Sequence, residues 1–294
     1  MRKRFLILLF IFLILFLSFP LHSSAEASSV SSLEEMYERM GEDVEEWKTE
    51  TVYRTSFEPK NLEIEKIRGK VEDYITSNCF YSFSWKYQKR GKGYEVEIEY
   101  SYYMTEGEYR KVKEECKRIA KQLEGKSDYE KIKYAHDYIV FVCDYSYIND
   151  GPYSCLFRGS TACNGYALAF QMIMDACNIP CCYITNTNHA WNRVLLDNFW
   201  YNVDVTWDDP GGTEPTYDWF LKCNSDFPDH SGADANALVS YELVEGLAKS
   251  EVFTFFLKMQ ITRYWPFIVG VIILGIAIIA YRWLSLRRSD GQLS

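Results

Sequence analysis

Beyond the N-terminal segment, hydrophobic positions follow first a helical spacing and then a strict alternation. Apolar side chains recur every three or four positions at residues 33–47 and 64–74, which predicts two amphipathic helices. Aromatic and aliphatic residues then alternate with polar ones over residues 81–87 and 94–102, on both sides of Gly91-Lys92-Gly93. This pattern predicts a β-hairpin with one covered face and one solvated face.

Two capping boxes predict the starts of the next two helices. Thr105 and Ser127 are each followed by a glutamate three residues later and then by an apolar stripe. His136 lies on the second stripe, which favours a hydrogen-bonded histidine of the core over a catalytic one. Residues 144–159 are rich in Tyr, Asp and Gly, and we expect a loop there that walls a cleft.

The stretch after this loop predicts one helix followed by three strands. The helix begins near Cys163, with Ser160 or Thr161 as its N-cap, and ends before Pro180. The strands are expected at residues 181–185, 189–196 and 199–206.

The turn Asp197-Asn198 is a hairpin signal, and it sets the register of the last two strands. With these two residues as the loop, Trp191 pairs with Asp204 and His189 pairs with Thr206. His189 and Asp204 then lie on one face as diagonal neighbours, whereas a shift by one residue would separate them.

A cysteine, a histidine and an aspartate thus arrive in the order of a catalytic triad. In the first turn of its helix, Cys163 meets unpaired amides and the positive end of the macrodipole, which favour a thiolate. Asp204 can accept a hydrogen bond from one nitrogen of His189 and aim the other nitrogen at the helix. Taken singly, a buried or disulfide-bonded cysteine, a packed histidine and a solvated aspartate are commoner. Their order, spacing and shared face favour catalysis.

Other polar residues of this region are weaker candidates. Asp208 and Asp209 precede a Pro-Gly turn and are expected to be solvated, because a calcium loop needs more oxygen ligands at fixed spacing. His230 lies outside any strand pattern and is a poor candidate for the general base. Residues 217–221 predict a strand that closes the sheet.

Three motifs resemble the core of the transglutaminase-like superfamily, which has a papain-like cysteine fold. They are Thr161–Ala167, Asn188–Asn192 and Trp200–Pro210. The resemblance covers about residues 127–230 and places the family's Cys, His and Asp on Cys163, His189 and Asp204. It implies an α+β core in which the helix bearing Cys163 packs on an antiparallel sheet bearing the other two residues, preceded by an N-terminal α/β extension.

The resemblance implies acyl chemistry on amide bonds through a thioester, with Cys163 as nucleophile, His189 as general base and acid, and Asp204 as the residue that orients the imidazole. The Cys163 backbone amide is the expected oxyanion donor. The superfamily contains both proteolysis and transfer to an amine, so we expect a cysteine peptidase (a hydrolase) or an acyltransferase with a peptide or protein substrate. The alternative is a catalytically idle module that binds peptide or cell-envelope components. No cofactor is implied.

Both ends of the chain carry apolar segments. Met1-Arg2-Lys3-Arg4 precedes an apolar run to Phe19 and a small-residue site at Ala25-Glu26-Ala27, which predicts a signal peptide cleaved after Ala27, or else an uncleaved anchor. Residues 264–284 are long enough to span a bilayer, and arginines follow them, which predicts a single-pass membrane protein with the catalytic domain outside and the C-terminus cytoplasmic.

The expected organisation follows from these segments. We expect a signal peptide or anchor at residues 1–27, an extension of helices plus a hairpin at 28–126, and the catalytic core at 127–230. A linker with a juxtamembrane helix follows at 231–263, then the transmembrane helix at 264–284 and the tail at 285–294. The formal net charge of −9 argues against a nucleic-acid partner. The span lacks GxxxG, so no oligomeric state is predicted.

The nine cysteines are an odd number for an exported chain. With Cys163 reserved as a thiol, the other eight could form up to four disulfides. No CxxC pair or histidine-rich cluster has the spacing of a zinc site, so neither a metal site nor disulfide exchange is expected.

Overall fold

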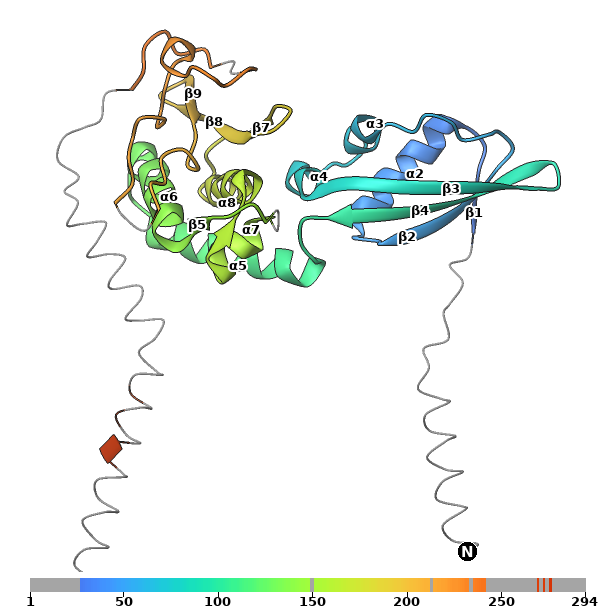
Figure 1. The fold of residues 1–294 in the computed structure, drawn as a ribbon, viewed down its shortest axis with the longest axis horizontal. Helices are drawn as coiled ribbons and strands as arrows, with labels where there is room; N and C mark the ends of the chain where they lie inside the picture. Colours follow the sequence, from blue (N-terminus) through green and yellow to red (C-terminus); the bar gives the residue numbers. More distant parts are fainter. Residues whose placement is uncertain are drawn as a thin grey trace, which may run out of the picture.

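The computed structural model describes residues 27–148, 151–211, 214–232 and 235–241, together with residues 269, 272, 275 and 276. It is a mixed α/β structure with two lobes, seen side by side in Figure 1. The buried hydrophobic side chains form two clusters, and the larger one, around residues 105–241, also includes Ile75 and Cys79. We name the part from β1 to β4, residues 28–102, the N-terminal lobe, and the part from residue 105 to residue 241 the C-terminal lobe.

A four-stranded sheet with the order β1-β2-β4-β3 forms the N-terminal lobe. The predicted hairpin is confirmed as β3 (Phe80–Arg90) and β4 (Gly93–Tyr102), and β1 (Ser28–Val30) and β2 (Glu50–Thr55) extend it. The expected covered face is wrong for most of β3, where Trp85 and Tyr87 are exposed. The first predicted helix is confirmed as α2 (Leu33–Glu45), which buries Met36, Met40 and Val44.

The second predicted helix, at residues 64–74, is wrong in its extent: one short helix covers its start, and another begins only at its last residue. These are α3 (Ile64–Arg68) and α4 (Tyr74–Cys79). Gly69 ends α3, and the Asp73 side chain accepts hydrogen bonds from the amides of Ile75 and Thr76 to begin α4. A cap of this kind starts a new helix where one continuous apolar stripe suggested a single one.

The C-terminal lobe is built around α8 (Cys163–Ala176), with β7 (Cys181–Thr185), β8 (Ala190–Leu196) and β9 (Phe199–Val203) forming an antiparallel sheet in that order. Two long helices, α5 (Glu106–Gln122) and α6 (Asp128–Val142), also pack on α8. Both begin with the predicted capping boxes, which are confirmed at Thr105 and Ser127.

The hairpin turn between β8 and β9 is also confirmed. Asp197 and Asn198 have φ values of 50° and 67°, the left-handed conformation that a two-residue turn requires, and Leu196 pairs with Phe199. The ladder ends at Asn192 and Val203, so the expected strand to residue 206 is too long. The strand predicted at residues 217–221 is wrong: nearby, one bridge between Asn202 and Lys222 stands in its place, before the 3₁₀ turn η2 (Asn224–Asp226).

The loop expected at residues 144–159 contains regular structure. Its first residues form β5 (Asp144–Tyr145), which pairs in parallel with β6 (Ser160–Thr161) just before α8. The short helices α7 (Gly151–Tyr153) and η1 (Ser154–Arg158), the latter a π-helix, lie between them.

The two lobes meet where α4 contacts α8. The Tyr74 hydroxyl donates to Asp175 Oδ1 at 2.8 Å, and Asn78 Nδ2 donates to Gln171 Oε1 at 3.0 Å. The domain boundary at residue 126 stays a prediction. The helix α5, which precedes that boundary, contributes Cys116 and other buried residues to the core around α8.

The predicted signal segment and nearly all of the predicted membrane span lie outside the described residues. Among the described residues, no helix has the length and apolarity to cross a membrane. All nine cysteines lie in the described part, six of them buried, and all nine are free thiols; no disulfide joins any of the eight that were available for pairing.

Candidate active site

Cys163 is the first residue of α8 and is half-buried. The N-cap is Ala162, so the expected capping by Ser160 or Thr161 is wrong. Those two residues form β6 instead, and their pairing with β5 fixes the chain immediately before the helix. An alanine side chain offers the first amides of the helix no hydrogen-bond acceptor.

Gly165 allows a close approach at this first turn. A Cβ atom there would lie 2.3 Å from Thr161 Cγ2 and 2.8 Å from the carbonyl oxygen of Gly151. Real Cβ atoms do not come so close to other atoms, so the contact of β6 and α7 with the start of α8 requires glycine. The chain's own segments therefore fill the space beside Gly165.

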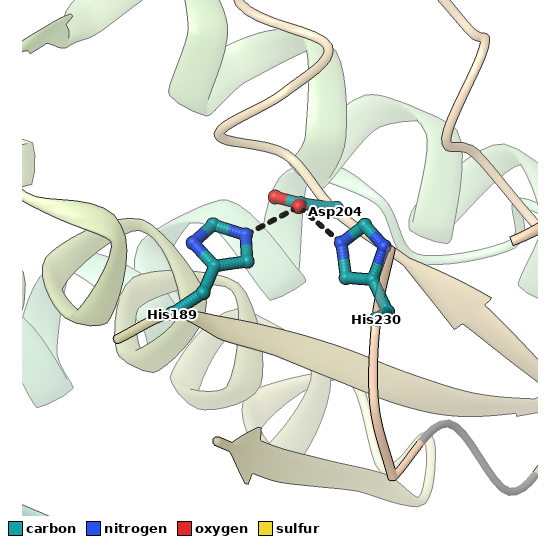
Figure 2. A group of neighbouring side chains, drawn as sticks. All are labelled: His189, Asp204 and His230. Atoms are coloured by element: carbon teal, nitrogen blue, oxygen red, sulfur yellow. Dashed lines mark hydrogen bonds and ion pairs between the residues drawn. The ribbon is translucent and has the colours of Figure 1, made fainter. Parts of the chain in front are cut away.

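His189 comes directly before β8 and faces Asp204, as Figure 2 shows. His189 Nε2 lies 2.6 Å from Asp204 Oδ2. A turn holds the histidine in place, because the Asn186 side chain accepts from the His189 amide at 2.9 Å and the Asn186 amide donates to the His189 carbonyl. The predicted proximity of the two side chains is therefore present.

Asp204 reaches His189 from a turn rather than from the end of a strand. Its Oδ1 accepts hydrogen bonds from the amides of Thr206 at 3.0 Å and Trp207 at 3.2 Å, which form the first turn after β9. The carboxyl is fully buried. Burial opposes its ionisation, but the hydrogen bonds from His189 and His230 outweigh burial and lower its pKa.

The surroundings of His189 favour the imidazolium form. Burial disfavours the charged ring, but hydrogen bonds with Asp204 and with Cys163 outweigh it and raise the pKa of His189 to about 9. The same imidazole thus contacts Asp204 through Nε2 and has the Cys163 thiol as a neighbour. Trp207 stacks on the imidazole with ring centroids 5.2 Å apart and restricts its rotation.

His230 belongs to the same cluster, which the sequence analysis missed. It is buried, and its Nε2 lies 2.8 Å from Asp204 Oδ2, the oxygen that His189 also contacts. Figure 2 shows the two rings on either side of the carboxylate. His230 comes from a loop without periodicity, so no hydrophobic pattern could have indicated its place.

His189, Asp204 and His230 also satisfy the composition of a metal site, since one potential ligand atom from each lies within 4.8 Å of the others. The contacts of 2.6 and 2.8 Å to Asp204 Oδ2 have the length of hydrogen bonds. Two ligands of one tetrahedral zinc ion, each about 2.0 Å from it, lie about 3.3 Å apart. The arrangement is therefore that of a hydrogen-bonded cluster.

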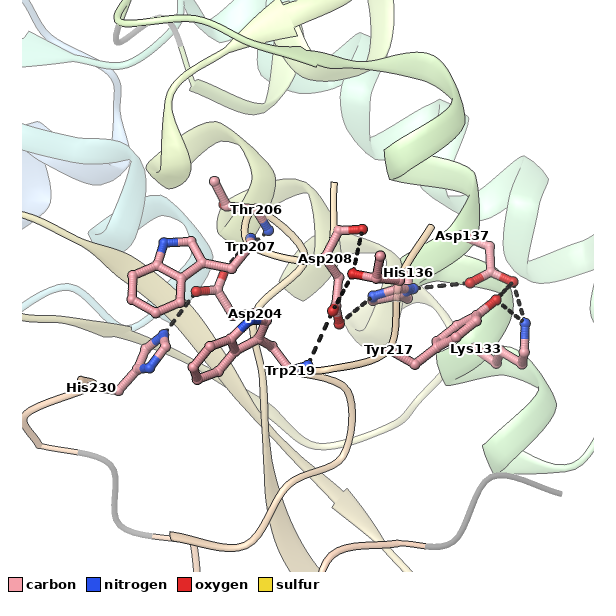
Figure 3. Close-up of polar contacts among 11 residues, drawn as sticks. Lys133, His136, Asp137, Asp204, Thr206, Trp207, Asp208, Tyr217, Trp219 and His230 are labelled. Carbon is pink, nitrogen blue, oxygen red and sulfur yellow. Dashed lines mark hydrogen bonds and ion pairs between the residues drawn. The ribbon is translucent and has the colours of Figure 1, made fainter. Parts of the chain in front are cut away.

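A second histidine cluster, around His136, lies beside Asp204 and His230, as Figure 3 shows. The predicted core position of His136 is confirmed: Nδ1 lies 2.9 Å from Asp137 Oδ1, and Nε2 lies 3.0 Å from Asp208 Oδ2. Burial disfavours the charged ring, but the two carboxylates outweigh it and raise the pKa of His136 to about 9. Asp137 also accepts from Lys133 and from Tyr217, so α6 is joined to the segment after β9.

The two aspartates expected to be solvated both have protein partners. Asp208 is buried, and its Oδ1 accepts from the Trp219 amide at 3.1 Å and from Thr216 Oγ1 at 2.9 Å. Asp209 Oδ2 accepts from the Tyr166 hydroxyl of α8 at 2.6 Å. These contacts fix both sides of the segment that carries Asp204.

The comparisons with known proteins agree with the resemblance. A family model described as the transglutaminase-like superfamily, Transglut_core, matches residues 117–205, a range that includes Cys163, His189 and Asp204. No curated protein matches the chain. Residues 117–205 are thus similar to transglutaminase-like domains.

Solved structures also show similarity. One is described as a TGase, with 11% identity and a TM-score of 0.31 over 61% of this chain and 59% of the other. A proposed cysteine protease from Cytophaga hutchinsonii has 12% identity and a TM-score of 0.28 over 42% and 62%. A proposed protease from Parabacteroides distasonis has 11% identity and a TM-score of 0.26 over 52% and 39%. The chain spans less than two thirds of the length of each.

Proposed function

We propose that this protein is a cysteine enzyme that acts on amide bonds of peptides or proteins through a thioester intermediate. One observation carries the proposal: His189 Nε2 lies 2.6 Å from the buried carboxylate of Asp204, and the Cys163 thiol is near enough to the same imidazole to help raise its pKa. A thiol, an imidazole and a carboxylate in that order are the parts that nucleophilic acyl chemistry requires.

In the proposed reaction, the Cys163 sulfur attacks the amide carbonyl carbon, and the thiol proton resides on His189. The tetrahedral intermediate collapses when His189 gives that proton to the leaving amine, and a thioester on Cys163 remains. Water or a second amine then attacks the thioester, with His189 taking the proton of the attacking group and returning one to the Cys163 sulfur. The product is the acid or a new amide.

Two further features support these steps. The Cys163 amide, at the positive end of α8, is the proposed donor to the oxyanion. Asp204 holds His189 in one orientation, because its own Oδ1 is fixed by two backbone amides. Screening with and without amine acceptors distinguishes water from an amine as the acceptor.

We further propose that the enzyme is tethered at the cell membrane with both lobes outside. Support comes from the apolar run at residues 5–19 and the longer one at residues 265–284, which is followed by Arg287 and Arg288. Protease added to intact cells should degrade the lobes and spare the C-terminal tail. Lobes that resist protease until the membrane is broken would contradict this topology.

The test of the chemistry is the pH profile of alkylation by iodoacetamide, measured for each cysteine by mass spectrometry in the purified protein. We expect Cys163 to react rapidly well below pH 8, and His189→Ala to slow it. Cys177 and Cys182, which are also half-buried, serve as reference thiols in the same digest.

If Cys163 is alkylated no faster than the reference thiols, the enzyme function is excluded. The alternative, a module that binds peptide, would then remain. An activated Cys163 would justify screening peptide libraries with and without amine acceptors, to separate hydrolysis from acyl transfer.

A further inference from the structure

The carboxylate of Asp204 has two imidazole partners on one oxygen. Its Oδ2 lies 2.6 Å from His189 Nε2 and 2.8 Å from His230 Nε2. Its Oδ1 is occupied by the amides of Thr206 and Trp207. Each carboxylate oxygen accepts about two hydrogen bonds, so His189 and His230 together fill Oδ2 and share its negative charge.

The second imidazole is held at both of its nitrogens. His230 Nδ1 lies 2.9 Å from the carbonyl oxygen of Pro228, and Nε2 lies 2.8 Å from Asp204 Oδ2. The ring is therefore fixed against the same carboxylate oxygen that His189 contacts.

Aromatic side chains enclose His230. The ring centroids lie 3.9 Å from Phe227, 4.5 Å from Trp207, 5.0 Å from Trp191 and 5.1 Å from Trp219. Rings packed this closely on several sides hold the imidazole in one orientation. Trp207 also stacks on His189, which joins the two imidazoles through one indole.

We propose that His230 is a positioning residue of this site: by sharing Asp204 Oδ2, it limits the pull of the carboxylate on His189 and so sets the pH at which His189 gives up its proton. This inference rests on the proposed function, because it concerns the base of that reaction. The two imidazole rings are close neighbours, with centroids 5.5 Å apart.

The groups that face this pair come from several elements. Among the described residues, Asp204 lies between the rings, and the Cys163 thiol of α8 is near His189. Tyr145 of β5 and Tyr183 of β7 are the other titratable groups near that thiol. The walls around His230 come from β8 and from the loops after β9, and consist of Trp191, Trp207, Trp219 and Phe227. None of the four carries a charge.

The test uses iodoacetate, an anionic reagent, on Cys163 of the full chain between pH 5 and pH 11. The imidazolium of His189 attracts the reagent, so the rate falls when His189 loses its proton. In the unaltered protein this fall should be centred near pH 9. In His230→Phe, which keeps an aromatic ring and removes both nitrogens, we expect it to move up by about one pH unit.

Two further variants make the result specific. His230→Gln keeps a neutral donor and should give a smaller upward shift, and it also serves if His230→Phe fails to fold. Asp229→Asn removes the adjacent exposed charge, and asparagine tolerates the φ of 65° at that position, so its profile should match that of the unaltered protein.

The outcomes separate the two proposals. A slow Cys163 that His189→Ala leaves unchanged overturns the proposed function and this inference with it. Cys163 could instead be activated and show its fall in rate at the same pH in a folded His230 variant and in the unaltered protein. That result overturns the inference alone. A change in rate without a shift in that pH would indicate a purely structural role and also counts against it.

Discussion

Two histidines of the C-terminal lobe have the same raised pKa and opposite surroundings. Burial is outweighed by hydrogen-bonded partners in both, and the pKa of each is raised to about 9. The His136 side chain is 0% exposed and lies between two carboxylates. The His189 side chain is 13% exposed and lies between one carboxylate and a thiol. A raised pKa therefore does not mark a catalytic base; access and a nucleophile do.

The comparison also gives the two clusters different tasks. His136 ties α6 to Asp208, and Asp208 lies four residues after Asp204 in the same turn segment. We call the group around His136 the inner cluster and the group of His189, Asp204 and His230 the outer cluster. The inner cluster thus stabilises the backbone segment that carries the Asp204 carboxylate of the outer cluster. We expect changes in the inner cluster to appear as lost stability and changes in the outer cluster as lost reactivity.

The largest expected effect is that of Asp204→Asn on the chemistry. An amide cannot stabilise the imidazolium of His189, so alkylation of Cys163 at pH 6 should fall to the rate of Cys177. Activity on a substrate found by screening should fall by about 10³- to 10⁴-fold. Asp229→Asn is the matched control, with the same change in charge at an exposed position. An Asp204→Asn protein with the reactivity of the unaltered chain would show that the outer cluster is not a triad.

Replacing the inner histidine should act on stability instead. His136→Phe keeps the volume of the ring but leaves Asp137 and Asp208 without their imidazole, which should cost about 3–5 kcal/mol in the free energy of unfolding. Urea denaturation measures this loss. Adding Asp208→Asn removes one of the uncompensated charges and should recover part of it. A loss below about 1 kcal/mol would mean that the buried ring is not held as a cation.

Local signals in the sequence were enough for much of the fold. The capping boxes at Thr105 and Ser127 depend on residues three apart, and the turn at Asp197 and Asn198 depends on two neighbours, so each could be predicted from a short window. The turn fixed the register of β8 and β9, and that register brought His189 near Asp204.

The missed features depend on contacts between distant parts of the chain. Asp208 contacts His136, 72 residues away, and is buried. Asp209 accepts from Tyr166, 43 residues away, and is partly buried. The pairing of β6 with β5 takes Thr161 away from the role of N-cap. His230 is held by aromatic residues from separate segments, and no local pattern of hydrophobic positions encodes such an enclosure.

The smallest expected effect is the dependence of stability on pH, and it sharpens the comparison because it isolates the inner ring. A histidine with a folded-state pKa of about 9 and an ordinary value of 6.5 stabilises the fold fully below pH 6.5. This contribution is lost as the pH rises through 9. For the fully buried His136 it amounts to about 3 kcal/mol at about 1.4 kcal/mol per pKa unit.

Urea midpoints at pH 6 and pH 9.5 measure this loss. The unaltered protein should be less stable at the higher pH, and His136→Phe should show a smaller difference. His189 titrates in the same window, so some dependence should remain in that variant and should decrease further when His189→Ala is added. Equal pH dependence in the unaltered protein and in His136→Phe would mean that the inner histidine is neutral in the folded protein. The contrast between the two clusters would then lie in charge as well as in access.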